Sequence, residues 1–421
     1  MKVLTAVAVL CTAAVRTRAH QPQCPRNADG LAVQMLESTI ARGQGITGSG
    51  AATSTIELGI FQQALRESIA CGRNETQRQH WAEYLQNSTS GSISLFSNAT
   101  ADAGQPLDRL SVGTSMIYQY RETGDEEYLP AIAALQDSVK LQPQNANGGL
   151  WYYANPNNLS AYHNLSYSDG MFSYPAFALL SGEVLSVSNA TVDRDLFGLA
   201  ATVKQIARLY GICKNDAGLV VHGYDASKAH AWANPITGAS PVVWGRSLAW
   251  YTLGISNALE ILQSLNVSRD ASDSLGQLFE SLVSAQLAAL ERSLGVGGAY
   301  GVWQVVDQPG ANFQGHGNFI EASASCMTAY SLLRGARLGF IEDANLRRRA
   351  ISAGIGIYHQ VLHEFLVSND NGTLSLNGTS AVASLSGDVD FTYYVTRPVV
   401  LNSLIGISAF ILAGLEVEKV C

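Results

Sequence analysis

Apolar side chains recur every three or four residues along most of the chain, which is the spacing of one buried face of an α-helix. Strict alternation of apolar and polar residues is scarce and predicts only short strands in loops, at 219–221, 300–303 and 373–376. The pattern predicts twelve helices, over residues 29–42, 55–71, 77–86, 108–122, 127–140, 170–183, 191–210, 244–263, 273–291, 319–338, 343–362 and 402–417.

The connections between these helices suit antiparallel neighbours, so the twelve helices pair into six hairpins. The chain shows no strict repeat that would favour a solenoid, and no Pro-, Gly- or Ser-rich linker that would divide it. We therefore predict one all-α domain over residues 20–421, in which a closed ring of hairpins buries the amphipathic faces.

Three connections are unusually long and rich in aromatic and polar residues, at 141–169, 212–244 and 293–319. Long ordered loops in a compact domain are usually functional. If alternate loops emerge at one end of the ring, these three are expected to line a common cavity.

Composition narrows the possible partners. Of the 421 residues, 47% are hydrophobic and 14% charged, and the formal net charge is −8. A chain this apolar can bury a large core, and its acidic balance argues against nucleic acid or an anionic membrane as partner. The oligomeric state is not set by the sequence, and a monomer is the simplest expectation.

The first residues have the three parts of a secretory signal peptide. Met1-Lys2 is followed by an apolar run over residues 3–14, too short to span a membrane, and then by Thr17-Arg18-Ala19. We predict cleavage after Ala19, with Ala14 as the alternative site; a buried first helix is the structural alternative. Nine Asn-X-Ser/Thr triplets also favour a secreted glycoprotein, at Asn74, Asn87, Asn98, Asn158, Asn164, Asn189, Asn266, Asn371 and Asn377.

Removal of the signal peptide with Cys11 leaves five cysteines, Cys24, Cys71, Cys213, Cys326 and Cys421. Five is odd, so at least one thiol is free or paired between chains. Cys326 lies in a small, apolar helical stretch and is expected to be buried and unreactive. No Cys/His cluster has the spacing of a zinc site, and neither a metal nor an organic cofactor is implied.

Two aspartates stand out because each precedes a predicted helix. Asp108 opens the helix at 108–122, where a helix cap is the simpler interpretation. Asp169 lies between Tyr167 and Phe172, and burial among aromatic rings raises the pKa of a carboxyl group and makes it a useful general acid. For Asp169 the cap and the catalyst are equally good interpretations.

A second group of candidates comes from a segment dense in aromatic residues. His222 opens it, and Trp244, Arg246 and Trp250 follow around a predicted helix start. Aromatic rings stack on the apolar faces of sugars, and Arg binds carboxylates with a planar fork. A packed Trp cluster with an Arg extended along it is the structural alternative. Glu321, in a first helical turn, is expected to have a structural or orienting role.

Taken in order, these segments resemble the unsaturated uronyl hydrolases of glycoside hydrolase families 88 and 105. The resemblance spans about Gly59 to Leu415, and its most distinctive part is the block from Trp232-Ala233-Asn234-Pro235 to Trp244-Gly245-Arg246. The other matching pieces are Asp108 with Gly113 and the stretch 120–125, Gly148-Gly149-Leu150-Trp151, Ser168-Asp169-Gly170-Met171, His222-Gly223-Tyr224-Asp225, Trp303-Gln304-Val305 with Glu321-Ala322-Ser323, and the closing stretch 404–410.

The resemblance implies an (α/α)6 barrel and a hydrolase that acts on Δ4,5-unsaturated uronic acids. In such enzymes a catalytic Asp protonates C4 of the double bond and activates a water that adds at C5. Asp169 matches this acid/base and Asp108 the assisting carboxylate, while His222, Trp244, Arg246 and Trp250 match sugar-binding positions. The Trp-Gly-Arg pattern favours family 105 and unsaturated galacturonyl-rhamnose, a product of pectin breakdown.

The chain departs from the family pattern in several places. A His commonly follows the Gly-Gly-Phe-Trp stretch, where this chain has Tyr152, and a Trp is common where it has Tyr167. Two alternatives therefore stay open: another glycosidase of the same barrel acting on saturated glycans through a flanking carboxylate pair, and a carbohydrate-binding relative without activity.

Overall fold

The computed structural model of the protein describes residues 30–154, 160–187, 193–297 and 299–421. Within these ranges the chain forms fourteen α-helices and four small two-stranded sheets. The predicted signal peptide and the acceptors Asn158 and Asn189 lie outside the described residues. No helix in the described ranges is long and apolar enough to cross a membrane.

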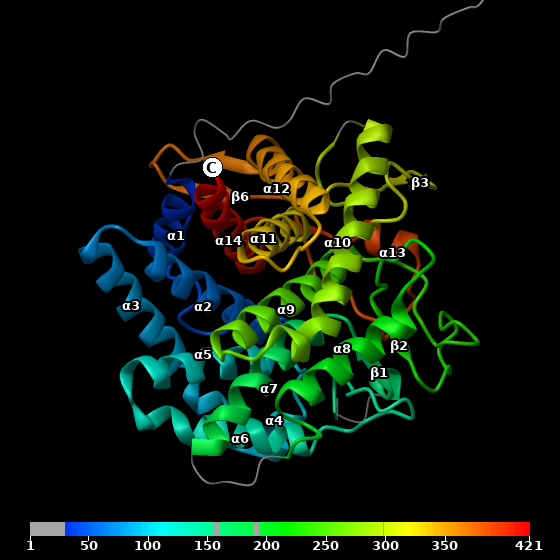
Figure 1. Ribbon diagram of the computed structural model, residues 1–421. Helices are drawn as coiled ribbons and strands as arrows, with labels where there is room; N and C mark the ends of the chain where they lie inside the picture. The colour runs from blue at the N-terminus through cyan, green and yellow to red at the C-terminus, as the bar shows by residue number, and fades with distance from the viewer. Residues whose placement is uncertain (1–29, 155–159, 188–192, 298) are drawn as a thin grey trace, which may run out of the picture.

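Six helices form an inner ring (Figure 1). Each packs against the next along the chain, and the last packs back on the first, so the ring is closed. These helices are α2 (Ser54–Cys71), α5 (Arg109–Thr123), α7 (Gly170–Val187), α9 (Gly245–Ser264), α11 (Ala322–Leu338) and α14 (Leu404–Val420).

An outer helix covers each inner one. Five outer helices directly follow their inner partners in sequence: α3 (Glu75–Ser90), α6 (Leu129–Lys140), α8 (Leu199–Cys213), α10 (Arg269–Gly297) and α12 (Ala344–Glu364). The sixth pair joins the two ends of the chain, because α1 (Leu31–Ala41), in blue in Figure 1, packs on α14, in red. The predicted (α/α)6 barrel of six helical pairs is confirmed.

The inner helices pack closely because small residues stand at their contacts. Gly254 on α9 faces the backbone of α7, where a Cβ at position 254 would overlap the carbonyl oxygen of Met171. Gly113 on α5 likewise leaves room for the Phe177 ring of α7. Two outer helices begin with polar caps: the side chains of Asn74 and Asp343 accept hydrogen bonds from the first turns of α3 and α12.

The helix predictions differ from the structure mainly at boundaries and in short elements. The helix predicted over 191–210 begins only at Leu199, after Gly198 with a φ of 88°. Two helices of five residues, α4 (Ala99–Ala103) and α13 (Phe391–Val395), were not predicted, because they are too short to show a helical period.

The strands are short and pair antiparallel. The sheets join β1 (Leu165–Tyr167) to β2 (Gly223–Asp225), β3 (Asn312–Phe313) to β4 (His316–Gly317), β5 (Leu366–Ser368) to β6 (Leu374–Leu376), and β7 (Thr379–Ser380) to β8 (Val399–Val400). The strand predicted at 373–376 is confirmed as β6. The predictions at 219–221 and 300–303 are wrong as strands, since only isolated bridges form there, at Val220 and Trp303.

The cysteines agree with the expectation of at least one free thiol. Cys71, Cys213 and Cys326 are free, and Cys421 is disulfide-bonded. Cys326 is fully buried, as predicted, and burial keeps the pKa of its thiol far above the ordinary value.

The inner helices run parallel, so their N-termini meet at one end of the ring. Thr53, Asp108, Trp244, Glu321 and Ser403 are the residues that immediately precede five of these helices. The β1–β2 pair lies at the same end and sets Tyr167 opposite Gly223, which brings together the long segments 141–169 and 212–244.

Candidate active site

A pocket of about 120 Å³ opens at the N-terminal end of the inner ring. It collects side chains from the starts of four inner helices (α2, α5, α9 and α14), from the segment before α7 and from the segment after β7. Its main lining residues are Thr53, Ile56, Asp108, Tyr152, Tyr153, Tyr162, Tyr167, Asp169, Trp244, Arg246, Trp250, Val382, Ser384 and Ile405. Five of the six predicted site residues therefore lie around one pocket, and the sixth, His222, contacts Asp169 from behind.

Asp108 occupies the N-cap position of α5, but its side chain does not cap the helix. Its Oδ2 accepts a hydrogen bond of 2.6 Å from the Tyr152 hydroxyl, and within the described part of the chain its buried Oδ1 has no partner. Burial raises the pKa of Asp108 to about 7; the hydrogen bond from Tyr152 opposes this shift and the charge of Asp169 adds to it. The group is therefore poised to exchange a proton near neutral pH.

Asp169 lies just before α7 and is held from one side. Its Oδ2 accepts a hydrogen bond of 2.7 Å from Ser247 and lies 3.4 Å from Nε2 of His222. The other ring nitrogen of His222, Nδ1, is 2.8 Å from the Tyr394 hydroxyl, which fixes the imidazole. Ser247, His222 and Tyr394 thus orient one carboxylate oxygen of Asp169 and leave its other oxygen available to a ligand.

The two carboxyl groups form a pair in a dry site. Asp108 and Asp169 are both buried, and the negative charge on Asp169 favours a proton on Asp108. Two interacting carboxyls release their protons in separate steps that belong to the pair. A pair in which one carboxyl can hold a proton near neutral pH is what acid/base chemistry with two carboxyls requires.

Aromatic rings form the walls and floor of the pocket. Tyr152 stacks flat on Tyr167, with centroids 4.4 Å apart and planes 2° apart. Trp244 packs against His222 at 4.7 Å, and Trp250 packs against Phe172 at 4.5 Å below the carboxylates. Such surfaces exclude water and stack on the apolar faces of sugar rings.

Arg246 is buried, and its charge is balanced inside the protein. Its Nη1 lies 3.1 Å from Oε1 of Glu321 and donates to the carbonyl oxygen of Ser380 at 2.6 Å, while Nη2 donates to Ala381. The guanidinium also lies over the Trp244 ring, 4.6 Å from its centroid. Arg246 thus ties the segment after β7 to the start of α9, and Glu321 has the orienting position expected of it.

Several residues that build the site carried no recognisable signal in the sequence. Tyr394 lies far along the chain from His222, and Val382 and Ser384 belong to a segment without a motif. Ser247 adjoins a predicted residue, but nothing in the pattern marked its hydroxyl. Of the three long segments, 293–319 lines no part of this pocket among the residues described; its Gln304 instead accepts a hydrogen bond from the Trp244 indole at 3.1 Å.

A second, wider cavity of about 510 Å³ continues from the first and shares four lining residues with it: Thr53, Arg246, Val382 and Ile405. Small and aliphatic residues from 43–58, 380–382 and 400–405 form most of its wall, and its lining contains no aromatic side chain. Glu57 is its carboxylate, and Arg246 is its only cation among the described residues. The narrow pocket and the wide one form a continuous two-part site.

Comparison with known proteins gives consistent matches. The family model described as Glycosyl Hydrolase Family 88 matches residues 64–421. Protein Atu3128 of Agrobacterium fabrum is 32% identical over 221 residues, which cover 51% of this chain and 88% of that protein. A glycoside hydrolase from family 105 of C. acetobutylicum has a structure with a TM-score of 0.72 at 25% identity, covering 92% of this chain and 99% of that one.

A more distant solved structure has the same fold. It is an unsaturated glucuronyl hydrolase from Bacillus sp. GL1, described as responsible for the degradation of glycosaminoglycan. Its TM-score is 0.64 at 14% identity, with 93% of this chain and 96% of that one covered, and at this identity the likeness bears on the fold alone.

Proposed function

Because the chain belongs to glycosyl hydrolase family 88, we propose that it removes a Δ4,5-unsaturated uronic acid from the end of an oligosaccharide by hydrating the C4=C5 bond, and that its substrate is the unsaturated galacturonyl residue of rhamnogalacturonan fragments. The observation that carries the proposal is the pair of buried carboxyls, Asp108 and Asp169, at the bottom of a small aromatic pocket. A pocket of about 120 Å³ suits one terminal sugar ring rather than the middle of a chain.

In the proposed reaction Asp169 is the acid and then the base. When Asp169 carries the proton that the two carboxyls share, it gives that proton to C4, which leaves positive charge shared between C5 and the ring oxygen. Both carboxyls are then ionised, and Asp108 stabilises the positive charge. Asp169 then takes a proton from a water molecule whose oxygen bonds to C5. The hemiketal at C5 opens to a ketone, the exposed hemiacetal at C1 collapses to an aldehyde, and the aglycone leaves as an alcohol.

The lining of the wide cavity favours an uncharged sugar as the aglycone. An anionic sugar placed there would meet Glu57, and the cavity's cation, Arg246, is already paired with Glu321 at 3.1 Å. Aliphatic side chains of Leu58, Val382 and Val400 instead offer contact for a sugar with little polarity, such as a deoxyhexose. This chemistry favours rhamnose over a sulfated hexosamine as the leaving sugar.

Export and glycosylation belong to the same proposal. Seven of the nine acceptor triplets fall in the described residues, and six of their Asn side chains are exposed: Asn74, Asn87, Asn98, Asn266, Asn371 and Asn377. Asn164, the seventh, is half-buried in the segment that leads to Asp169. A secreted enzyme would meet plant cell-wall fragments outside the cell.

The proposal is tested by ultraviolet absorbance, since hydration destroys the conjugated double bond. The protein is mixed with unsaturated products of lyases acting on rhamnogalacturonan, pectin, ulvan and glycosaminoglycan. We expect loss of absorbance with the rhamnogalacturonan product and a decrease in rate of at least about a hundredfold for Asp169→Asn, the contribution typical of a positioned acid/base. The variant's unfolding curve should match that of the wild type.

Each other outcome corrects a different part of the proposal. Turnover of a sulfated glycosaminoglycan product alone would overturn the neutral aglycone and leave the chemistry intact. Absence of turnover on every unsaturated substrate, or full activity of Asp169→Asn, would overturn the hydration reaction itself.

A further inference from the structure

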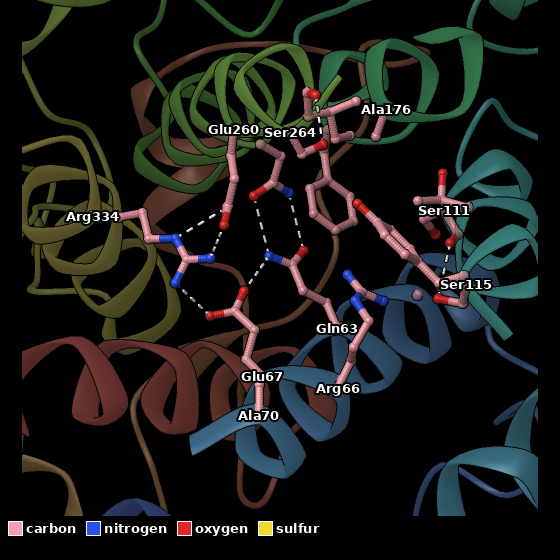
Figure 2. Close-up of a pocket in the computed structure, with 16 residues that line it drawn as sticks. Gln63, Arg66, Glu67, Ala70, Ser111, Ser115, Ala176, Glu260, Ser264 and Arg334 are labelled. Atoms are coloured by element: carbon pink, nitrogen blue, oxygen red, sulfur yellow. Dashed lines mark hydrogen bonds and ion pairs between the residues drawn. The ribbon is translucent and has the colours of Figure 1, made fainter. Parts of the chain in front are cut away.

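The inner ring contains a second polar cavity at the end opposite the catalytic carboxyls (Figure 2). Its volume is about 310 Å³, and its lining comes from the later turns of the inner helices, including Arg66 on α2, Tyr118 on α5, Asn257 on α9 and Arg334 on α11. No residue lines both this cavity and the catalytic pocket. The contacting rings of Phe172 and Trp250 lie between the two cavities, because Phe172 lines one and Trp250 the other.

Part of the cavity wall is already satisfied by internal contacts. Arg334 reaches Glu67 at 3.1 Å and Glu260 at 2.5 Å, and the amide of Gln63 exchanges two hydrogen bonds with that of Asn257, at 3.0 and 3.1 Å. Figure 2 shows these contacts bridging from one helix to the next along one side of the cavity. These groups hold their positions without a ligand.

Arg66 differs from the rest of the wall. Its guanidinium lies over the Tyr118 ring, with Cζ 4.1 Å from the centroid, and Figure 2 shows it extending into the space between Gln63 and Ser115. Among the residues that the structure describes, Arg66 has no hydrogen bond or ion pair, and the Tyr118 hydroxyl has no hydrogen bond. The contact with the ring holds the guanidinium in place and leaves its donors unused, which suits a planar carboxylate.

The rest of the nearby wall offers acceptors. The hydroxyls of Ser111, Thr114 and Ser115 donate back to carbonyl oxygens of their own helix, at 2.7, 3.0 and 3.4 Å. Their lone pairs are therefore left to accept hydrogen bonds from hydroxyl groups of a ligand. Glu67 and Glu260 also line the cavity, but both are paired with Arg334, so Arg66 is the cation of this lining that is left without an ion pair among the described residues. An unpaired cationic fork beside hydroxyl acceptors matches a small molecule that combines one carboxylate with several hydroxyls.

We propose that this cavity is a second binding site, which takes a sugar acid of monosaccharide size with its carboxylate on Arg66. The site is separate from the catalytic pocket, and its existence does not depend on the reaction proposed above. Because the two sites share no lining residue, occupancy of one does not exclude occupancy of the other.

The test uses D-galacturonate as the probe and D-galactose as its neutral match, since the two differ at C6 alone. Wild type, Arg66→Gln and the control Arg121→Gln are titrated by calorimetry, and wild-type and Arg66→Gln crystals are soaked with each sugar. Arg121 is a suitable control because it lies on α5 and pairs with Glu183 outside the cavity, so its loss changes the net charge equally.

We expect galacturonate density on Arg66 in the wild type and a loss of roughly tenfold or more in the affinity of that site in Arg66→Gln, as for removal of a charged hydrogen-bonding partner. Arg121→Gln should bind as the wild type does, and both variants should keep the wild-type turnover. Equal affinity for galactose, unchanged binding by Arg66→Gln, or a cavity without sugar density at saturation would overturn the proposal.

Discussion

The two ends of the inner ring shift the pKa of a buried carboxyl group in opposite directions. Glu416, near the end of α14, accepts hydrogen bonds from Arg334, Arg337 and Lys419 at 2.6 to 2.9 Å. Burial alone would raise its pKa, but these cations lower it to about 2. Asp108, at the catalytic end, has one phenolic donor, and burial raises its pKa to about 7.

The difference shows how one scaffold separates stability from chemistry. Where cations surround a carboxylate, its charge is fixed over the physiological range and ties helices together. Where a carboxylate meets only aromatic rings and one hydroxyl, burial makes the charged form costly and the proton exchangeable. Within the described residues, Oδ1 of Asp108 is a buried oxygen without a hydrogen-bond partner, whereas both carboxylate oxygens of Glu416 accept hydrogen bonds.

The largest predicted effect is the loss of the central cation at the stabilising end. Arg334→Met leaves Glu67, Glu260 and Glu416 close together without a full complement of positive charge. We expect the free energy of unfolding at pH 8 to fall by about 4 kcal/mol, as for one partner removed from a buried ion pair. Urea denaturation measures the loss, and turnover per folded molecule should stay at the wild-type level.

The pH dependence and a surface control sharpen this prediction. The lowered pKa of Glu416 contributes stability above its ordinary pKa of 4.5, and that stability is lost as the pH falls towards 2. The penalty of Arg334→Met should therefore shrink in acid, where the carboxylates take up protons. Arg349→Met, which breaks an exposed pair with Glu291, should cost less than about 1 kcal/mol; a comparable loss at both positions would contradict the comparison.

The second predicted effect is a gain in stability, at Asp108. Because the folded pKa of Asp108 is about 7 and its ordinary value is 3.8, ionisation of this group costs stability progressively between these values and in full above pH 7. Asp108→Asn removes that cost. We expect the variant to be more stable than the wild type by about 4 kcal/mol at pH 8 and equal to it below pH 4, while its activity is lost. Denaturation at the two pH values decides this, and a less stable variant at pH 8 would contradict it.

The smallest predicted effect concerns the single hydrogen bond that Asp108 accepts. Tyr152→Phe removes the donor that favours the ionised form, so the pKa of Asp108 should rise further. If the reaction needs one proton on the pair, the alkaline limb of the pH–rate profile should move up by about one unit. Tyr153→Phe serves as the control, because Tyr153 lines the same pocket without a hydrogen bond to Asp108, and its limb should not move.

The sequence predicted the helices well because each inner or outer helix is long enough to show a period of 3.6 residues. It predicted short elements poorly, and α13, with five residues, is an example. Tyr394 of this helix belongs to the site only because its hydroxyl contacts His222, which the sequence pattern does not indicate. The pairing of α14 with α1 could not be predicted either, because the hydrophobic pattern of a helix is the same whether its packing partner is near or far in the sequence.

The candidate site shows a similar limit. The sequence suggested Asp108 as a helix cap, and the structure places it at the cap position with its side chain turned to Tyr152 instead. For Arg246 the sequence left open an anion-binding group and an Arg packed along a Trp cluster. In the structure its contacts are internal, to Glu321 and to carbonyl oxygens of the segment after β7. Residue type and spacing indicate which side chains gather, but their hydrogen-bond partners depend on segments that the pattern does not describe.

The closing of the ring by α1 and α14 has a consequence for biosynthesis. As the chain leaves the ribosome, five helical pairs can form in order, but the apolar flanks of α2 and α11 have no neighbour on one side until residues 404–420 have been made. In one late step α14 then has to pack against α2, and this contact closes a loop that includes nearly the whole polypeptide. The entropic cost of closing such a loop grows only slowly with its length. The open ring is thus the state in which this protein most needs a chaperone.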